Sequence, residues 1–206
     1  MVKGRFITLE GIEGVGKTTH LAFIADYLEA RQYPVLITRE PGGTKAGEAV
    51  REILLHGKEI RIDAMTELLL MFAARAQHLQ EVVIPALAEG KIVLCDRFTD
   101  ASYAYQGGGR GIAQADIRIL EQLVQQELQP NLTLLFDASV QTGLSRAKKR
   151  SEADRFESET IAFFERVRQT YLERSRNKPD RIKIINAEQT LPAVEQDIIR
   201  LMESFL

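Results

Sequence analysis

The eight residues from Gly11 to Thr18 have the types and the spacing of a phosphate-binding loop. They fit the pattern G-x-x-x-x-G-K-[ST], with a strand-like run, residues 6–9, before them and a helix-like run, residues 19–30, after them. Glycines let backbone N–H groups close around a phosphate, and the N-terminus of the following helix adds partial positive charge. A chance glycine-rich turn is the alternative, and the two flanking elements argue against it. The residues expected to contact a bound ATP are Gly11, Ile12, Glu13, Gly14, Val15, Gly16, Lys17, Thr18 and Thr19.

Two side chains of this loop have direct chemical roles if a triphosphate binds. Lys17 would reach the β- and γ-phosphates, and the Thr18 hydroxyl would become a ligand of Mg²⁺. Glu13 is unexpected there, because a carboxylate inside an anion site is repulsive. The positive charge that the transferred phosphoryl group needs is therefore expected from elsewhere in the chain.

A basic stretch at residues 143–157 could supply that charge. A charge run by itself is usually a solvated helix face, which remains the alternative. Coupled to a phosphate loop, the stretch is predicted to be a short mobile lid on a single domain, residues 1–206, that closes over ATP and excludes water. Such a lid would also bring an arginine to the transition state. The cations are Arg146, Lys148, Lys149, Arg150 and Arg155.

Acidic residues stand where predicted strands end. Residues 38–44, which include Glu40, follow the second predicted strand, and Asp96 ends the third. In open parallel sheets the carboxyl ends of the strands form the crevice that holds ligands. Asp96 is expected to act on Mg²⁺ or its water molecules, with a helix or turn cap as the alternative. Asp137 ends another strand, and there a cap is expected because a helix-like segment follows at once.

The elements that position these motifs alternate between strands and helices. Short apolar, β-branched runs are separated by segments whose apolar residues recur with helical spacing. This alternation predicts an α/β fold of the P-loop NTPase type, with a five-stranded parallel sheet and helices on both faces. Residues 66–79 are apolar all round, so either a second subunit or deep burial in the monomer is expected to cover them. The predicted strands are residues 5–9, 35–38, 91–95, 132–136 and 182–185.

The composition of the 206-residue chain excludes several classes of protein. With 45% hydrophobic and 27% charged residues it is an ordinary globular chain with a sizeable core. A net charge of −2 leaves no global positive field for nucleic acid or an anionic membrane. The longest apolar stretch, residues 68–74, is far shorter than the roughly 20 residues of a membrane span. The single cysteine, Cys95, is expected in the core of a cytoplasmic protein.

Along essentially its whole length the sequence resembles bacterial thymidylate kinases. The resemblance implies Mg·ATP-dependent phosphorylation of dTMP to dTDP for dTTP synthesis. It also implies a homodimer built on helices that include residues 66–79. One subclass of this family has no basic residue in the phosphate loop and carries arginines in the lid instead, as Glu13 and the basic stretch suggest here. The resemblance rests on the phosphate loop with the preceding Thr8-Leu9-Glu10, and on the runs 38–44, 70–75, 95–98, 104–107 and 154–157.

The same resemblance implies roles in phosphate transfer. Arg51 and Arg97 correspond to contacts of the dTMP phosphate, and Glu40 to a partner of a magnesium-bound water near the acceptor. Arg150 corresponds to the lid arginine that reaches the phosphates, and Arg146 is expected to contact ATP. The residues expected to act in catalysis are Lys17, Glu40, Asp96, Arg97 and Arg150, with Thr18, Asp96 and Glu40 serving the metal.

Other residues correspond to contacts of the nucleoside. Arg75 and Gln106 correspond to readers of the thymine edge, Ser102 to a neighbour of the 5-methyl group, and Tyr105 to a wall against a ribose 2′-hydroxyl. The family places a stacking phenylalanine four residues before the base-reading arginine, where this chain has Met71. Phe72, three residues before Arg75, shares that helix face and is the predicted stacking residue.

Two other functions fit parts of the pattern. The loop and the lid alone would serve a kinase of AMP or CMP equally well, and only Arg75, Ser102, Tyr105 and Gln106 favour thymine. A nucleotide-dependent switch or a partition-type ATPase would also have a phosphate loop, but it would act through protein partners. Formation of dTDP separates both alternatives from a thymidylate kinase.

Overall fold

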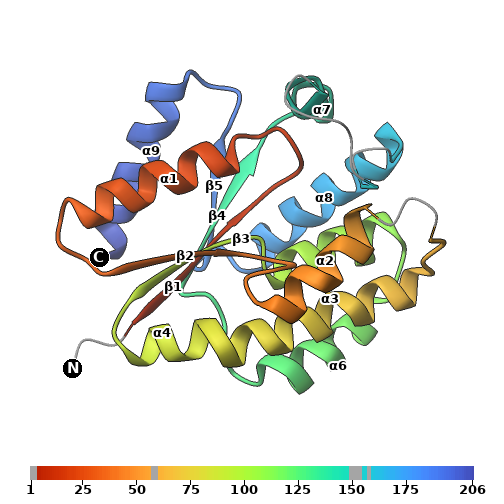
Figure 1. Cartoon of the computed structure of the whole chain (residues 1–206). Coiled ribbons are helices and arrows are strands. Elements are labelled where there is room, and N and C mark those ends of the chain that lie inside the picture. Colours follow the sequence, from red (N-terminus) through yellow and green to blue (C-terminus); the bar gives the residue numbers. More distant parts are fainter. Residues whose placement is uncertain (1–3, 57–59, 149–154, 157–158) are drawn as a thin grey trace.

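The computed structural model describes residues 4–56, 60–148, 155–156 and 159–206. Its centre is one sheet of five parallel strands in the order β2-β3-β1-β4-β5 (Figure 1). Each strand predicted from the sequence is present, with its ends within one residue of the expected positions. The α/β fold with a five-stranded parallel sheet is confirmed. The strands are β1 (Arg5–Glu10), β2 (Val35–Arg39), β3 (Ile92–Asp96), β4 (Leu132–Asp137) and β5 (Ile182–Asn186).

Helices connect the strands and follow the last one. Two of the helical stretches, η1 and η2, have π-helical hydrogen bonding. Among the described residues, no helix has both the length and the apolar character that crossing a membrane requires. The helices are α1 (Lys17–Glu29), α2 (Lys45–His56), α3 (Ala64–His78), η1 (Leu79–Val83), α4 (Ile84–Ala88), α5 (Thr99–Ser102), η2 (Tyr103–Gly109), α6 (Gln114–Gln125), α7 (Val140–Lys148), α8 (Ile161–Asn177) and α9 (Leu191–Phe205).

Neighbouring side chains of a strand point to opposite faces of the sheet, and both faces are covered. Ile7 of β1 packs in a cluster with Ile24 of α1 and Ile198 of α9. The preceding residue, Phe6, belongs to a second cluster with Val83 of η1. Helices α1 and α9 therefore cover one face, and η1 with α4 lies against the other (Figure 1).

Helix α3 contains the segment that the sequence shows as apolar all round. It begins after Asp63, whose side chain accepts a hydrogen bond from the Met65 N–H (2.9 Å). Leu68 and Phe72 are buried in a cluster shared with η2 and α6. Leu69, on another side of the helix, is 50% exposed. A single chain therefore does not bury this helix completely.

The carboxyl ends of β1, β3 and β2 meet at one edge of the sheet. Asp96, the last residue of β3, is aligned with Leu9 of β1 and with Arg39 of β2. The pairing continues beyond the strands, because the Arg97 N–H donates to the Leu9 carbonyl and the Glu40 N–H to the Asp96 carbonyl (both 3.0 Å). The phosphate loop and the segments after β2 and β3 therefore leave the sheet side by side.

A buried ion cluster ties α5 to the far end of α8. Asp100 is almost completely buried, and its carboxylate accepts hydrogen bonds from Arg174 (2.5 Å) and from two nitrogens of Arg181 (2.7 and 2.9 Å). Burial acts to raise the pKa of this carboxyl, but the two arginines outweigh it and hold the pKa well below its usual range. The start of α5, directly after the Asp96–Phe98 segment, is therefore anchored to α8.

Replacing Asp100 by Asn tests this anchor. The variant leaves two largely buried guanidinium groups without a counter-ion, so we expect the free energy of unfolding to fall by about 3–5 kcal/mol. Urea denaturation measures it. Asp197→Asn is the control, because it removes the carboxylate of an exposed pair with Arg200 and is expected to cost less than about 1 kcal/mol. Equal losses in the two variants would contradict the anchor.

Candidate active site

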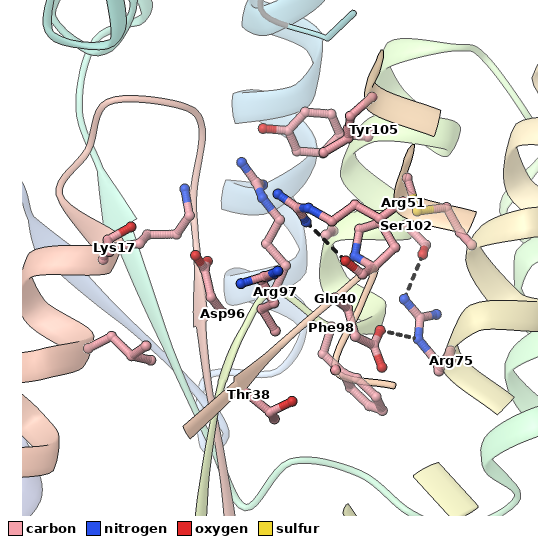
Figure 2. Close-up of a pocket in the computed structure, with 18 of the residues that line it drawn as sticks. Lys17, Thr38, Glu40, Arg51, Arg75, Asp96, Arg97, Phe98, Ser102 and Tyr105 are labelled. Atoms are coloured by element: carbon pink, nitrogen blue, oxygen red, sulfur yellow. Dashed lines mark hydrogen bonds and ion pairs between the residues drawn. The ribbon is translucent and has the colours of Figure 1, made fainter. Parts of the chain in front are cut away.

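A cavity of about 990 Å³ opens at the carboxyl edge of the sheet. Figure 2 shows Lys17 and Asp96 on one side of it and Arg75 with Ser102 on the other, with Arg97 between them. The cavity thus joins the phosphate loop to the segments that follow β2 and β3. The predicted site residues that line it are Glu13, Gly14, Gly16, Lys17, Thr18, Glu40, Arg51, Arg75, Asp96, Arg97, Ser102, Tyr105 and Gln106.

The phosphate loop wraps around the end of its own lysine. Lys17 Nζ donates to the carbonyl oxygens of Gly11 (3.0 Å) and Ile12 (2.8 Å). Burial, helped by the nearby Arg97, lowers the pKa of this amine to about 8. The lysine is therefore held by weak neutral acceptors, at a place where an anion would stabilise its charge.

The loop also packs directly against α7. Gly14 has φ +73°, in the left-handed region that favours glycine, and a Cβ there would lie 1.9 Å from the carbonyl oxygen of Gly143. A Cβ on Gly143 would in turn lie 2.6 Å from the carbonyl oxygen of Glu13. Two glycines therefore let the phosphate loop contact the helix that begins the basic stretch.

Arg97 is held in an unfavourable backbone conformation by a buried carboxyl group. Its φ is +69°, which costs a non-glycine residue about 1–2 kcal/mol. The next N–H, that of Phe98, donates to Glu10 Oε1 (2.8 Å), and Glu10 Oε2 accepts from the Tyr171 hydroxyl (2.7 Å). The guanidinium donates to the Gly11 carbonyl (3.1 Å). Glu10 and the phosphate loop together direct Arg97 into the cavity.

The carboxylate of Glu13 is turned toward the opposite wall of the cavity. It accepts a hydrogen bond from Arg97 (2.8 Å), and both of its oxygens accept from the Tyr105 hydroxyl (2.7 and 2.8 Å). Burial raises the pKa of Tyr105 well above its ordinary value, so this hydroxyl keeps the proton that it donates. Glu13 is therefore neutralised by Arg97 and does not leave an isolated negative charge in the phosphate loop.

Arg75 lies at the other end of the cavity and is positioned by a second buried carboxylate. It donates to Glu40 (2.7 Å) and to the Ser102 hydroxyl (3.0 Å). Glu40 also pairs with His78 Nδ1 (2.9 Å), and His78 Nε2 pairs with the Thr38 hydroxyl (2.6 Å). One guanidinium nitrogen of Arg75, Nη1, is buried and has no hydrogen-bond partner among the described residues. A donor is therefore available beside the cavity for an acceptor on a ligand.

Gln106 and Arg51 complete the lining. Gln106 is 1% exposed, and its amide Nε2 donates to Glu67 (2.9 Å). Arg51, on α2, donates to the Pro41 carbonyl (2.9 Å). The cavity thus has a cationic end near Lys17, Arg97 and Arg51, and a hydrogen-bonding end near Arg75 and Gln106.

Comparisons with known proteins decide the family. The sequence profile described as thymidylate kinase matches residues 9–198. A thymidylate kinase from Teredinibacter turnerae is 56% identical over 203 residues, which cover 98% of this chain and 99% of that protein. The chain belongs to the thymidylate kinase family. A second relative, the thymidylate kinase of Pseudomonas syringae pv. syringae, is also 56% identical, over 98% of this chain and 97% of its own length.

The fold agrees with that of the family. The crystal structure of a thymidylate kinase from Ehrlichia chaffeensis superposes with a TM-score of 0.80 at 33% identity. The match covers 97% of this chain and 98% of the other. Membership of the thymidylate kinase family makes the chain a nucleoside monophosphate kinase, a class of phosphotransferase.

Several predicted site residues lie elsewhere than in the lining of the cavity. Phe72 is in the core beneath Arg75, 4.5 Å from ring centre to guanidinium carbon, whereas Met71 lines the cavity. Arg146 donates to the carbonyl of Ala187 (2.8 Å), between α7 and the end of β5. Arg150 lies outside the described residues. The other predicted residues not among the lining are Gly11, Ile12 and Val15 of the loop and Thr19, exposed on α1.

Two side chains of the cavity could bind Mg²⁺, and this ion needs no more than that from a protein. Mg²⁺ in nucleotide sites takes one or two protein oxygens and completes its shell with phosphates and water. Asp96 Oδ1 is buried and has no hydrogen-bond partner among the described residues, and the Thr18 hydroxyl lines the same cavity. No group of three metal-ligating side chains occurs in the described part of the chain. Asp96 and Thr18 therefore fit an ion that arrives with phosphates.

Sequence reasoning missed the carboxylates and their partners behind the cavity. Glu10, Glu67, His78 and Tyr171 were not expected to serve the site. A faint signal existed for three of them, because Glu67, Arg75 and His78 share one side of α3, and Glu10 directly precedes the phosphate loop. Tyr171 lies 161 residues from Glu10, so nothing local indicates their contact.

Replacing Glu10 by Gln tests the buried carboxyl group. Burial, helped by the nearby Asp100, raises the pKa of Glu10 from 4.5 to about 8. The folded protein then keeps a proton that the unfolded chain releases, so we expect the free energy of unfolding to fall as pH rises from about 5 to 8. The amide of the variant retains an acceptor for the Phe98 N–H and does not titrate, so this fall should be smaller in the variant.

The measurement is urea denaturation at several pH values in that window. Glu203→Gln, at an exposed position of α9, is the control and should keep the wild-type pH dependence. A Glu10→Gln protein that loses as much stability as the wild type between these pH values would rule out a proton on Glu10.

Proposed function

We propose that the chain transfers the γ-phosphoryl group of ATP to dTMP, giving dTDP in a magnesium-dependent reaction that serves dTTP synthesis. The observation that supports it best is the two-ended cavity, with a phosphate loop and cations at one end and the unpaired N–H of Arg75 at the other. A nucleoside monophosphate has the same polarity, with an anion and a hydrogen-bonding base at opposite ends. The family of the chain favours thymine as that base.

The acceptor would lie with its phosphate toward Arg51 and Arg97. Its base would then meet Arg75, which can donate to the thymine O4, and Gln106, which can accept from N3–H. Ser102 would adjoin the 5-methyl group. The ring of Tyr105 would close the space that a ribose 2′-hydroxyl requires. Met71, which lines the cavity where the family has a phenylalanine, would cover the base in place of Phe72.

Phosphoryl transfer in this site would be driven mainly by electrostatics. The attacking group is an oxygen of the dTMP phosphate, so no strong general base is required, but two polyanions must approach each other. Lys17 and Arg97 now bind backbone carbonyls, and the phosphates would replace these weaker acceptors. Both cations would then lie where negative charge develops in the transition state.

Mg²⁺ would be held by Asp96 and the Thr18 hydroxyl. When bound, it would neutralise charge on the β- and γ-phosphates. Glu40, expected to act through a magnesium-bound water, uses its carboxylate oxygens for Arg75 and His78, so its main contribution would be to orient Arg75. The water-mediated role stays a prediction.

A lid is also part of the proposal. Arg150 would reach the transferred phosphoryl group from the basic stretch at 143–157, and Arg146 would adjoin the ATP. The contact between Gly14 and Gly143 supports this placement, because it brings the start of that stretch against the phosphate loop. Since Glu13 is already paired with Arg97, charge from this stretch would be needed at the γ-phosphate.

A homodimer is the proposed assembly. Four large apolar side chains are exposed on two neighbouring helices, Met65 and Leu69 of α3 and Ile119 and Leu123 of α6 (Figure 1). Each pair is spaced by four residues and so forms a stripe on its helix. A second copy of the chain would bury both stripes. We also propose a cytoplasmic location, where a free buried thiol such as that of Cys95 would stay reduced.

The substrate is tested by measuring kcat/KM with Mg·ATP and dTMP, dUMP or dCMP. We expect kcat/KM for dTMP to exceed that for dCMP by up to roughly 10⁴-fold, because cytosine presents an amino donor to Arg75. It should exceed kcat/KM for dUMP only about tenfold, since one methyl group is worth about 1 kcal/mol. Arg75→Ala should reduce the discrimination against dCMP more than the discrimination against dUMP. Efficient use of dCMP or AMP would replace the proposal by a broader monophosphate kinase.

The dimer is tested by Leu123→Asp, which places a charge in the proposed interface. The wild type should sediment at about twice the chain mass of 23.2 kDa, and the variant should dissociate at concentrations where the wild type does not. Leu191→Asp, at an exposed apolar position on α9, is the control and should leave the assembly unchanged. A monomeric wild type would refute the dimer.

A further inference from the structure

Glu67 is a buried carboxylate that the proposed mechanism does not use. It lies in the first turn of α3, and its side chain is 1% exposed. Its oxygens accept hydrogen bonds from Gln106 Nε2 (2.9 Å), from Arg110 Nε (3.2 and 3.3 Å) and from Arg155 Nη2. Two of its partners are therefore arginines that form ion pairs with it, while the third is a neutral amide that lines the active-site cavity.

The chemistry of a carboxylate decides how the Gln106 amide is turned. An ionised carboxylate only accepts hydrogen bonds, so the amide must present its NH₂ group to Glu67. If the amide were reversed, its oxygen would face the carboxylate, and a charge-assisted hydrogen bond would be replaced by repulsion. Gln106 Oε1, which has no hydrogen bond to a described residue, is then the atom left for a ligand.

We propose that Glu67 is a specificity-determining positioning residue, which fixes Gln106 as an acceptor and thereby makes the site select a base with an N–H at ring position 3. The proposal rests on the proposed function, in which Arg75 and Gln106 face the edge of the base. Arg75 offers a donor and Gln106 an acceptor, an arrangement complementary to O4 and N3–H of thymine. Cytosine has an amino donor and a bare ring nitrogen at the same positions, so both hydrogen bonds fail together.

The two arginines that pair with Glu67 help to fix the orientation of the Gln106 amide. Arg110 also pairs with Glu159, and Arg155 donates to the Leu54 carbonyl (2.7 Å), so both guanidinium groups are anchored independently of Glu67. Both therefore stay paired with the Glu67 carboxylate whether or not a ligand is bound. The orientation of Gln106 is therefore set before the base enters.

The test is Glu67→Gln, assayed by kcat/KM for dTMP and dCMP. The amide introduced at position 67 can donate as well as accept, so Gln106 becomes free to turn and to offer its NH₂ to the ring nitrogen of cytosine. Because a hydrogen bond to a charged group is worth about 1.5–3 kcal/mol, the preference for dTMP should fall about 10- to 100-fold. Part of that fall should be a rise in kcat/KM for dCMP, which damage to the fold cannot produce.

Two further proteins separate orientation from loss of charge. Glu159→Gln removes another partner of Arg110 but leaves Glu67 and Gln106 intact, so it should keep the wild-type ratio within about threefold. The double variant Glu67→Gln with Gln106→Glu exchanges the two groups and conserves charge. The carboxylate that this variant carries at position 106 can only accept, so the preference for dTMP should return toward the wild-type value.

The outcomes distinguish the inference from the function on which it rests. A wild type that does not prefer dTMP refutes the proposed function. If the wild type prefers dTMP but a folded Glu67→Gln protein keeps the full ratio, or Glu159→Gln loses as much, then Glu67 does not set specificity. If Glu67→Gln does not fold, the double variant decides, because loss of the dTMP preference in that protein would overturn the inference.

Discussion

An ionised carboxylate accepts hydrogen bonds and cannot donate them, and the active site depends on this one-way property. Glu13, Glu40 and Glu67 each lie behind or beside the cavity and are each paired with an arginine. Each therefore turns a donor toward itself and fixes what its partner can offer to a ligand. Glu13 aligns Arg97, Glu40 aligns Arg75, and Glu67 leaves the Gln106 oxygen free. Cations at one end of the cavity and a donor with an acceptor at the other follow from these three pairings.

Burying a carboxylate costs free energy unless its oxygens accept hydrogen bonds. The carboxylates of the site therefore bind donors from several elements and so link these elements to one another. Glu40 is held between α3 and the end of β2, because Arg75 and His78 stand one helical turn apart on α3. Glu67 joins α3 to η2 and to Arg155 at the end of the basic stretch. Helix α3 is thus the common support of the base end of the site. Its opposite side remains apolar and exposed at Leu69.

The sheet and the phosphate loop could be predicted because their signals are local. Five apolar runs and one eight-residue motif place the strands and the loop within one residue of their positions. The roles of single polar residues were harder to predict. The sequence shows that a carboxylate stands at the end of a strand, but not which distant residue it contacts. Asp137 was expected to cap α7, and this was wrong, because its carboxylate makes two hydrogen bonds to Arg168 of α8 (2.7 and 2.9 Å). A cap is a local contact, whereas this pair joins residues 31 positions apart. Phe72 and Met71 show the same limit of sequence-based prediction. They are adjacent on α3, yet Phe72 lies in the core and Met71 lines the cavity.

Glu13 explains how a phosphate loop can contain an acid. Its carboxylate reaches across the cavity to Arg97 and Tyr105 on the opposite wall. Arg97 can serve it and an incoming phosphate at once, because a guanidinium group has five N–H donors in a fixed fork and only part of them is used by Glu13 and Gly11. Lys17 has three N–H donors, and the carbonyls of Gly11 and Ile12 accept from two of them. Its pKa is lowered to about 8 by burial among carbonyls, so a phosphate that replaces those carbonyls would also restore the full charge of the lysine. The nucleotide therefore completes the electrostatics of the loop that binds it, while the carboxylates around the acceptor are already in place.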